Sequence, residues 1–187
     1  MGLLRRTITA VMSFRLWLLC LAVLGLLMVA STVADADHLP DNRVARGKAD
    51  SILCGIDVKN SSVAALSKLL GKPTVVRSDT RIWKTANVKV EVGIDQALNG
   101  DNSPGALYIS YVEVWGTKPD GKLGRTGKGL ALGDTIDRLR EVYGTRYIEK
   151  LANGVHTVSI EWRDTTGLQV EFDKNGRVNH MRLLAPE

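Results

Sequence analysis

Two short segments of the chain carry apolar residues at helical spacing. Within 63–70 and within 136–143 these residues recur three and four positions apart and so share one face of a helix. Asn60-Ser61-Ser62 precedes the first segment, and Gly133-Asp134-Thr135 precedes the second, where Asp134 or Thr135 can cap the helix. A glycine closes each segment, where positive φ is needed. The pattern predicts two helices, closed by Gly71 and Gly144.

The segments that follow each helix alternate between apolar and polar residues, as strands do. Asp173-Lys174-Asn175-Gly176 is a strong turn, since Asn-Gly tolerates φ > 0 at both positions. The apolar phase shifts between Val178 and Met181, which predicts a β-bulge or an edge position in the last strand. Six strands are predicted, at 74–83, 88–92, 107–115, 158–162, 168–172 and 177–183.

The order of one helix followed by three strands occurs twice, and the two closing glycines lie 73 residues apart in register with other helix positions. This spacing indicates an internal duplication with repeats at 50–115 and 130–187. The connector at 116–129 is rich in glycine and lysine and is expected to be exposed and mobile. We therefore predict an α+β fold in which the strands form one antiparallel sheet with both helices packed on one face.

The start of the chain has the pattern of an export signal. Three arginines precede an apolar run at 16–29, and Ala34-Asp35-Ala36 supplies the small-x-small cleavage pattern. We predict cleavage after Ala36, with Ala34 as the alternative site, followed by a polar linker at 37–49. The rival interpretation is an uncleaved membrane anchor at 16–33. Either pattern predicts an extracytoplasmic protein, periplasmic or secreted, or anchored to the inner membrane.

Export changes the charge and cysteine content of the chain. Removal of residues 1–36 takes away three arginines and one aspartate and lowers the formal net charge from +5 to +3. Charge this mild argues against nucleic acid or an acidic polymer as partner. Only Cys54 remains, so no intrachain disulfide forms. Its apolar neighbours favour a buried small side chain over an intermolecular disulfide.

No residue constellation in the sequence indicates catalysis, a metal or a cofactor. Gly116 and Gly121-Lys122 have the spacing of a phosphate-binding loop, but Leu123 stands where Ser or Thr is required, and further glycines replace the helix. The three histidines fit no metal-binding spacing. A flexible basic loop and structural histidines explain these residues, and we predict a protein that is not an enzyme.

Aromatic residues on the predicted strands are the best candidates for a binding surface. Tyrosine and tryptophan on a sheet are effective contact residues for protein partners. Trp162 is instead expected to be buried, since it alternates in phase with apolar residues. The candidate protein-binding residues are Trp83, Tyr108, Tyr111 and Trp115.

The helix segment 63–70 with Gly71-Lys72-Pro73, the segment Leu132–Gly144 and the meander after each resemble the tandem-repeat fold of β-lactamase-inhibitor-like proteins and of small outer-membrane-assembly lipoproteins. The resemblance covers residues 52–183 and implies a bacterial extracytoplasmic protein whose sheet face binds other proteins. The lipobox cysteine and the paired cysteines of those families are missing here. The sequence thus favours an exported, non-enzymatic protein-binding module of the bacterial envelope with an unknown protein partner. The alternative is an envelope structural or assembly factor tethered through 16–33.

Overall fold

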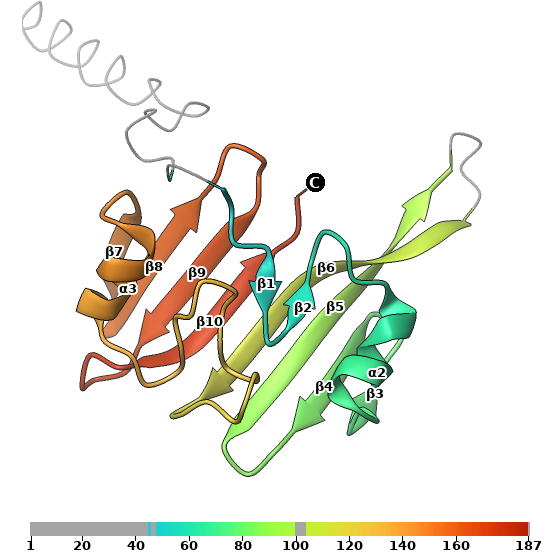
Figure 1. The fold of residues 1–187 in the computed structure, drawn as a ribbon, viewed down its shortest axis with the longest axis horizontal. Helices are drawn as coiled ribbons and strands as arrows, with labels where there is room; N and C mark the ends of the chain where they lie inside the picture. Colours follow the sequence, from blue (N-terminus) through green and yellow to red (C-terminus); the bar gives the residue numbers. More distant parts are fainter. Residues whose placement is uncertain (1–44, 46–47, 100–103, 187) are drawn as a thin grey trace, which may run out of the picture. The chain divides into compact units, whose positions relative to one another are not determined.

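The computed structural model describes residue 45 and residues 48–99 and 104–186. Eight strands form one antiparallel sheet, accompanied by a two-stranded hairpin and short helices (Figure 1). The hairpin is β1 (Ile52–Leu53) and β2 (Ile56–Asp57). The sheet strands are β3 (Val75–Val76), β4 (Thr80–Lys84), β5 (Val88–Leu98), β6 (Pro104–Gly116), β7 (Ile148–Ala152), β8 (Val155–Glu161), β9 (Gly167–Phe172) and β10 (Val178–Leu184). The helices are the 3-10 turn η1 (Val63–Ala65), α2 (Leu66–Leu70) and α3 (Ile136–Tyr143).

The large sheet consists of two four-stranded meanders that meet at its centre. Its strand order is β3-β4-β5-β6-β10-β9-β8-β7, so each meander starts at an outer edge and runs inward. β6 and β10 pair antiparallel, with Trp115 opposite His180 and Tyr111 opposite Leu184. A short helix precedes each meander in the chain. The internal duplication stays a prediction.

The local signals at the helix ends are confirmed. The Ser62 hydroxyl accepts a hydrogen bond from the Ala65 amide, and the Thr135 hydroxyl accepts one from the Arg138 amide. Gly71 and Gly144 follow the helices with φ of 77° and 79°, in the region that favours glycine. The β-bulge predicted in the last strand is present between Val178 and His180.

The predicted α+β fold with two helices covering the sheet is wrong. The described part of the chain is mostly β and only 12% helical, and α2 and α3 have five and eight residues. The sheet has eight strands rather than the six predicted. A turn divides the predicted strand at 74–83 into β3 and β4, and β7 was not predicted from the sequence. β7 reads Ile-Glu-Lys-Leu-Ala and is mostly exposed on the outer edge, so no alternation of apolar and polar residues marks it.

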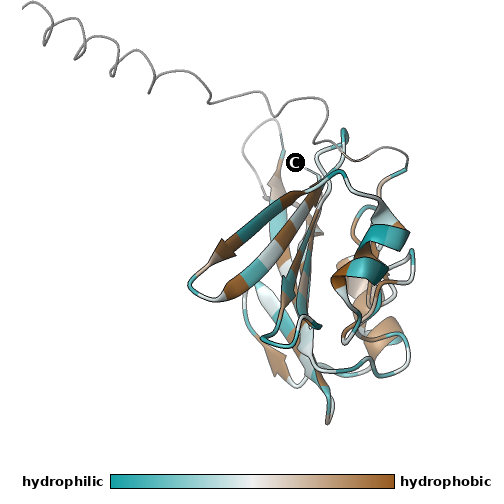
Figure 2. Cartoon of the chain, turned by 90° about the vertical axis from the view of Figure 1, so that its left-hand side faces the viewer, coloured by the Kyte–Doolittle hydropathy of each residue, from teal (hydrophilic) through white to brown (hydrophobic). Residues whose placement is uncertain are grey.

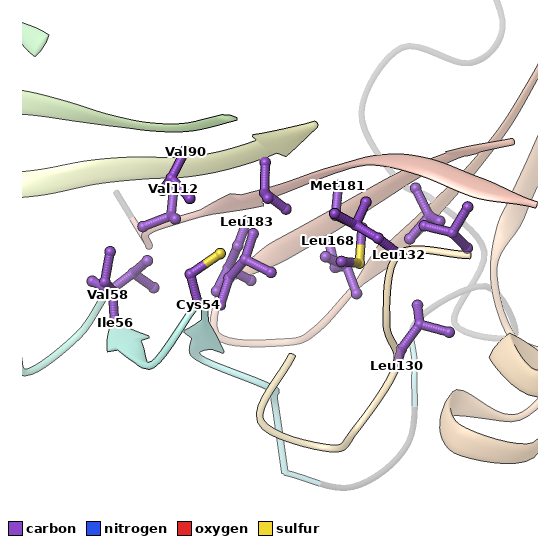
Figure 3. Packing of buried hydrophobic residues seen from close by; sticks show 14 of the residues in the cluster. Cys54, Ile56, Val58, Val90, Val112, Leu130, Leu132, Leu168, Met181 and Leu183 are labelled. Carbon is purple, nitrogen blue, oxygen red and sulfur yellow. The ribbon is translucent and has the colours of Figure 1, made fainter. Parts of the chain in front are cut away.

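Much of the sheet's buried face is covered by the β1–β2 hairpin and by the segment between β6 and α3. Figure 3 shows Cys54 on the hairpin and Leu130 and Leu132 on the segment between β6 and α3. These side chains face the sheet, where Met181 and Leu168 are labelled. All of these side chains are buried. This part of the layer therefore consists of a short hairpin and irregular backbone rather than helix, which explains why helical periodicity did not reveal it.

The connector at 116–129 is attached to the hairpin rather than wholly exposed. The Cys54 amide donates to the Arg125 carbonyl over 2.9 Å, and the Gly127 amide donates to the Ile52 carbonyl over 2.8 Å. Gly124 and Thr126 are buried. The glycines that suggested mobility here allow close packing: a Cβ on Gly124 would lie 2.7 Å from the Leu132 side chain.

A buried carboxylate joins three segments beneath the hairpin. Asp50 is 4% exposed and accepts hydrogen bonds from the Tyr143 hydroxyl at 2.6 Å and the Lys128 amide at 2.9 Å. The Tyr143 oxygen also lies 2.7 Å from the Thr126 hydroxyl. Burial, and then the Asp50 carboxylate, raise the pKa of Tyr143. This cluster fixes α3 and the connector to the start of the described chain.

The predicted export signal, its cleavage site and the anchor at 16–33 lie outside the described residues. Of the predicted linker, Ala45 is buried, and its amide donates to the Glu161 carbonyl at the end of β8 over 2.8 Å. No helix among the described residues is long and apolar enough to span a membrane.

Candidate functional site on the open face of the sheet

The two faces of the large sheet differ in what lies against them. Along β6, Val112 and Val114 are fully buried, whereas the residues that alternate with them are only partly buried. Figure 2 shows the helices and loops on one side of the sheet, and no described residue forms a layer on the other. We call this second side the open face. Its central residues are Lys89, Glu91, Tyr111, Glu113, Trp115, Glu171, His180 and Arg182.

One row of the open face is built around Trp115. Lys89 of β5 and His180 of β10 lie directly opposite Trp115, on the two sides of β6. The Lys89 ammonium lies 4.0 Å from the indole centroid, and the His180 ring stacks at 4.9 Å with the planes 4° apart. The indole is therefore flanked on both faces, and its outer edge remains for contact with a partner.

Two carboxylates fix the orientation of His180. Its Nε2 lies 3.0 Å from Glu113 Oε1, and its Nδ1 lies 3.1 Å from Glu171 Oε2. These groups come from the strands on either side of β10, so the contact spans the centre of the sheet. His180 is 9% exposed and cannot change rotamer without losing both contacts.

A second row is built around Tyr111, which lies over a glycine. A Cβ at Gly93 would be only 2.1 Å from Tyr111 Cε1, so the ring needs a residue without a side chain beneath it. The Tyr111 hydroxyl donates to Glu91 Oε1 over 3.2 Å. Burial, and then the negative charge of Glu91, raise the pKa of Tyr111 to about 12. The hydroxyl thus stays protonated and remains a donor.

Arg182 differs from Lys89, the other cation of the open face, because it has no acidic partner among the described residues. Its guanidinium carbon lies 4.7 Å from the centroid of the Tyr111 ring. Within the described part of the chain, its side chain forms no ion pair or hydrogen bond, and its Nε is buried without a partner. The guanidinium is therefore held by a ring and has donors left for an acceptor on another molecule.

The four aromatic residues predicted to bind a partner lie in three places. Tyr111 and Trp115 are on the open face. Trp83 is 5% exposed, and its indole N–H donates to the Gly71 carbonyl at the end of α2, so it belongs to the core. Tyr108 is 45% exposed near the end of β6. Trp162 is buried, as predicted.

The charged residues of the open face were not predicted from the sequence. Glu113, His180 and Arg182 alternate with buried apolar residues, and this alternation alone places them on the outer face. The pairing of β6 with β10, which brings Glu113 to His180, is not encoded in any local pattern. His156 does not meet His180: it lies opposite Phe172 and 2.6 Å from Glu149.

Two further candidate residues of the sequence, Cys54 and Lys122, line a shallow hollow of ≈ 280 Å³. Cys54 is buried, as its neighbours predicted, and burial raises the pKa of its thiol to about 12. Gly121 and Lys122 form a turn closed by hydrogen bonds between Asp120 and Leu123. Within the described ranges, no three acidic, histidine or cysteine side chains converge as a metal site.

Comparison of the chain with protein-family models, with curated proteins and with solved structures found no match. The resemblance to β-lactamase-inhibitor-like proteins therefore stays a prediction.

Proposed function

We propose that the chain is a non-enzymatic protein-binding module of the bacterial envelope and that its binding surface is the open face. Arg182 carries the proposal, because it is oriented by Tyr111 and lacks an acidic partner among the described residues. Arginine, tyrosine and tryptophan dominate the energetics of protein interfaces. We expect a carboxylate of the partner at Arg182.

The order of the surrounding side chains supports the same proposal. Trp115, His180 and Tyr111 are held by contacts across neighbouring strands before any partner arrives. Side chains that are already ordered lose little conformational entropy on binding, which favours affinity. The export pattern at the start of the chain supports a location outside the cytoplasm, and sequencing the N-terminus of the native protein distinguishes release after Ala36 from retention of 16–33.

The test starts with a photo-crosslinking residue at Gln169, which is on the open face beside Arg182. A matched probe at Leu151, 77% exposed on β7, is the control. We expect a partner that crosslinks from Gln169 and not from Leu151. Arg182→Ala and Trp115→Ala should weaken binding of that partner about tenfold or more, and Arg182→Lys should weaken it less. Equal affinity of these variants, with unchanged melting temperatures, would contradict the proposal.

A further inference from the structure

The open face ends in a hollow beside Tyr108. A space of ≈ 420 Å³ opens there, in the size range of ligand sites in proteins. It is lined by Asp95 of β5, Tyr108 and Ser110 of β6, and Leu184 and Pro186 at the end of the chain, together with Thr165. Leu184 lies opposite Tyr111, so the hollow adjoins the second row of the open face.

The lining combines one carboxylate with an apolar and aromatic wall. Asp95 lies opposite Tyr108 in the β5–β6 pair, and both are exposed. Asp95 has no ion pair or hydrogen bond through its carboxylate within the described part of the chain. Tyr108 and Leu184 are 45% and 41% exposed, so they offer an aromatic and an aliphatic surface to an occupant of the hollow.

We propose that this hollow binds a basic side chain, arginine or lysine, of the protein that docks on the open face. The cation pairs with Asp95 and lies against the face of the Tyr108 ring. The aliphatic part of the side chain packs on Leu184 and Pro186, as the stems of long basic side chains do on apolar surfaces. This inference rests on the proposed function, because it names a feature of the same partner.

Charge complementarity across the surface supports a basic occupant. Among the described residues, Asp95 is an acid without a partner and Arg182 is a base without one. Tyr111 contacts Arg182, and Leu184 lines the hollow together with Asp95. A partner that supplies a carboxylate to Arg182 and a cation to Asp95 satisfies both groups. It cannot dock in the reverse orientation without placing like charges together, so the pair also sets the direction of docking.

The test needs no knowledge of the partner. Acetyl-arginine-methylamide is titrated into the isotope-labelled full chain in a non-denaturing detergent, and backbone amide shifts are followed by NMR. Acetyl-citrulline-methylamide, which has the same shape without the charge, is the matched probe. We expect shifts at Asp95, Tyr108, Ser110 and Thr165, with weak affinity near the millimolar range for so small a ligand. The citrulline compound should bind about tenfold more weakly.

Two variants locate the effect. Asp95→Asn should weaken binding of the arginine probe about tenfold, whereas Asp120→Asn, at an exposed carboxylate in the connector turn, should not. Equal binding of the two probes, equal loss in both variants or shifts elsewhere on the chain would overturn the inference. The crosslinking from Gln169 does not depend on this hollow, so the two proposals fail separately.

Discussion

The two faces of the sheet are stabilised by different means. The covered face packs apolar side chains of the sheet against an irregular layer, and Leu130, Leu132 and Met181 are almost wholly buried there. The open face carries rings and charges that contact one another across neighbouring strands. Burial of apolar area contributes most to stability, whereas half-exposed polar contacts contribute little each. The difference indicates that the covered face maintains the fold, and it supports the proposal that the open face contacts another molecule.

The largest expected effect is on the covered face. Leu132→Ala removes a side chain that is 2% exposed and in contact with the connector, and it leaves a cavity that irregular backbone only partly closes. We expect the free energy of unfolding to fall by about 2–5 kcal/mol in urea titrations monitored by circular dichroism. A loss below about 1 kcal/mol would show that the layer over the sheet does not hold the fold.

A smaller loss of unfolding free energy is expected from a change at Gly93, where the Tyr111 ring of the open face packs directly over the backbone. Gly93→Val places a side chain where the Tyr111 ring lies, so the ring has to move, at a cost of about 1–3 kcal/mol. In the double variant with Tyr111→Ala the obstruction disappears, and the valine should become nearly neutral. A double-mutant cycle of unfolding free energies measures this coupling. Additive effects would mean that the ring does not need the glycine.

The buried thiol of Cys54 makes the stability of the covered face depend on pH. The pKa of Cys54 rises from 9.0 to about 12 because the group is buried, so the folded state holds the proton more tightly than the unfolded state does. This contribution leaves stability unchanged below pH 9 and reduces it as pH rises from 9 towards 12. At pH 8 we expect iodoacetamide to label the Cys54 peptide only after unfolding in guanidinium, as measured by mass spectrometry. Rapid labelling of the folded chain would contradict the burial.

The smallest effect is expected at an exposed contact of the open face. Lys89→Ala removes the cation over Trp115 and the ion pair with Glu91, both partly exposed. We expect the free energy of unfolding to change by only about 0–1 kcal/mol. Trp115 becomes more exposed, which should be visible as increased quenching of its fluorescence by acrylamide. A larger loss of stability would mean that this face also maintains the fold.

Local features of the chain could be predicted from sequence, and long-range pairings could not. Ser62, Thr135, Gly71 and Gly144 delimit the helices because caps and positive φ depend on adjacent residues. The burial of Cys54 and Trp162 followed from their apolar neighbours. The layer formed by Leu130 and Leu132 was missed because its backbone has no period.

The candidate site shows the same division. Tyr111 and Trp115 could be assigned to one face by alternation along a single strand. Gly93 beneath Tyr111 and Glu171 beside His180 lie on the neighbouring strand of the same meander, so these contacts depend on strand register. Arg182 over the Tyr111 ring lies on the other meander, so this contact depends on how the two meanders join. Trp83 was predicted to bind a partner, and its position in the core was missed because it depends on the place of α2 above the sheet.

The central pair of strands has a consequence for folding kinetics. Within each meander, successive strands are joined by short connections, so their pairing closes small loops. β6 and β10 are separated by residues 117–177, and closing that longer loop costs more conformational entropy. We expect the two meanders to form early and to join late, with amides of the β6–β10 seam protected last in pulsed hydrogen exchange. The open-face cluster at His180 would then assemble only when the two halves of the chain have joined.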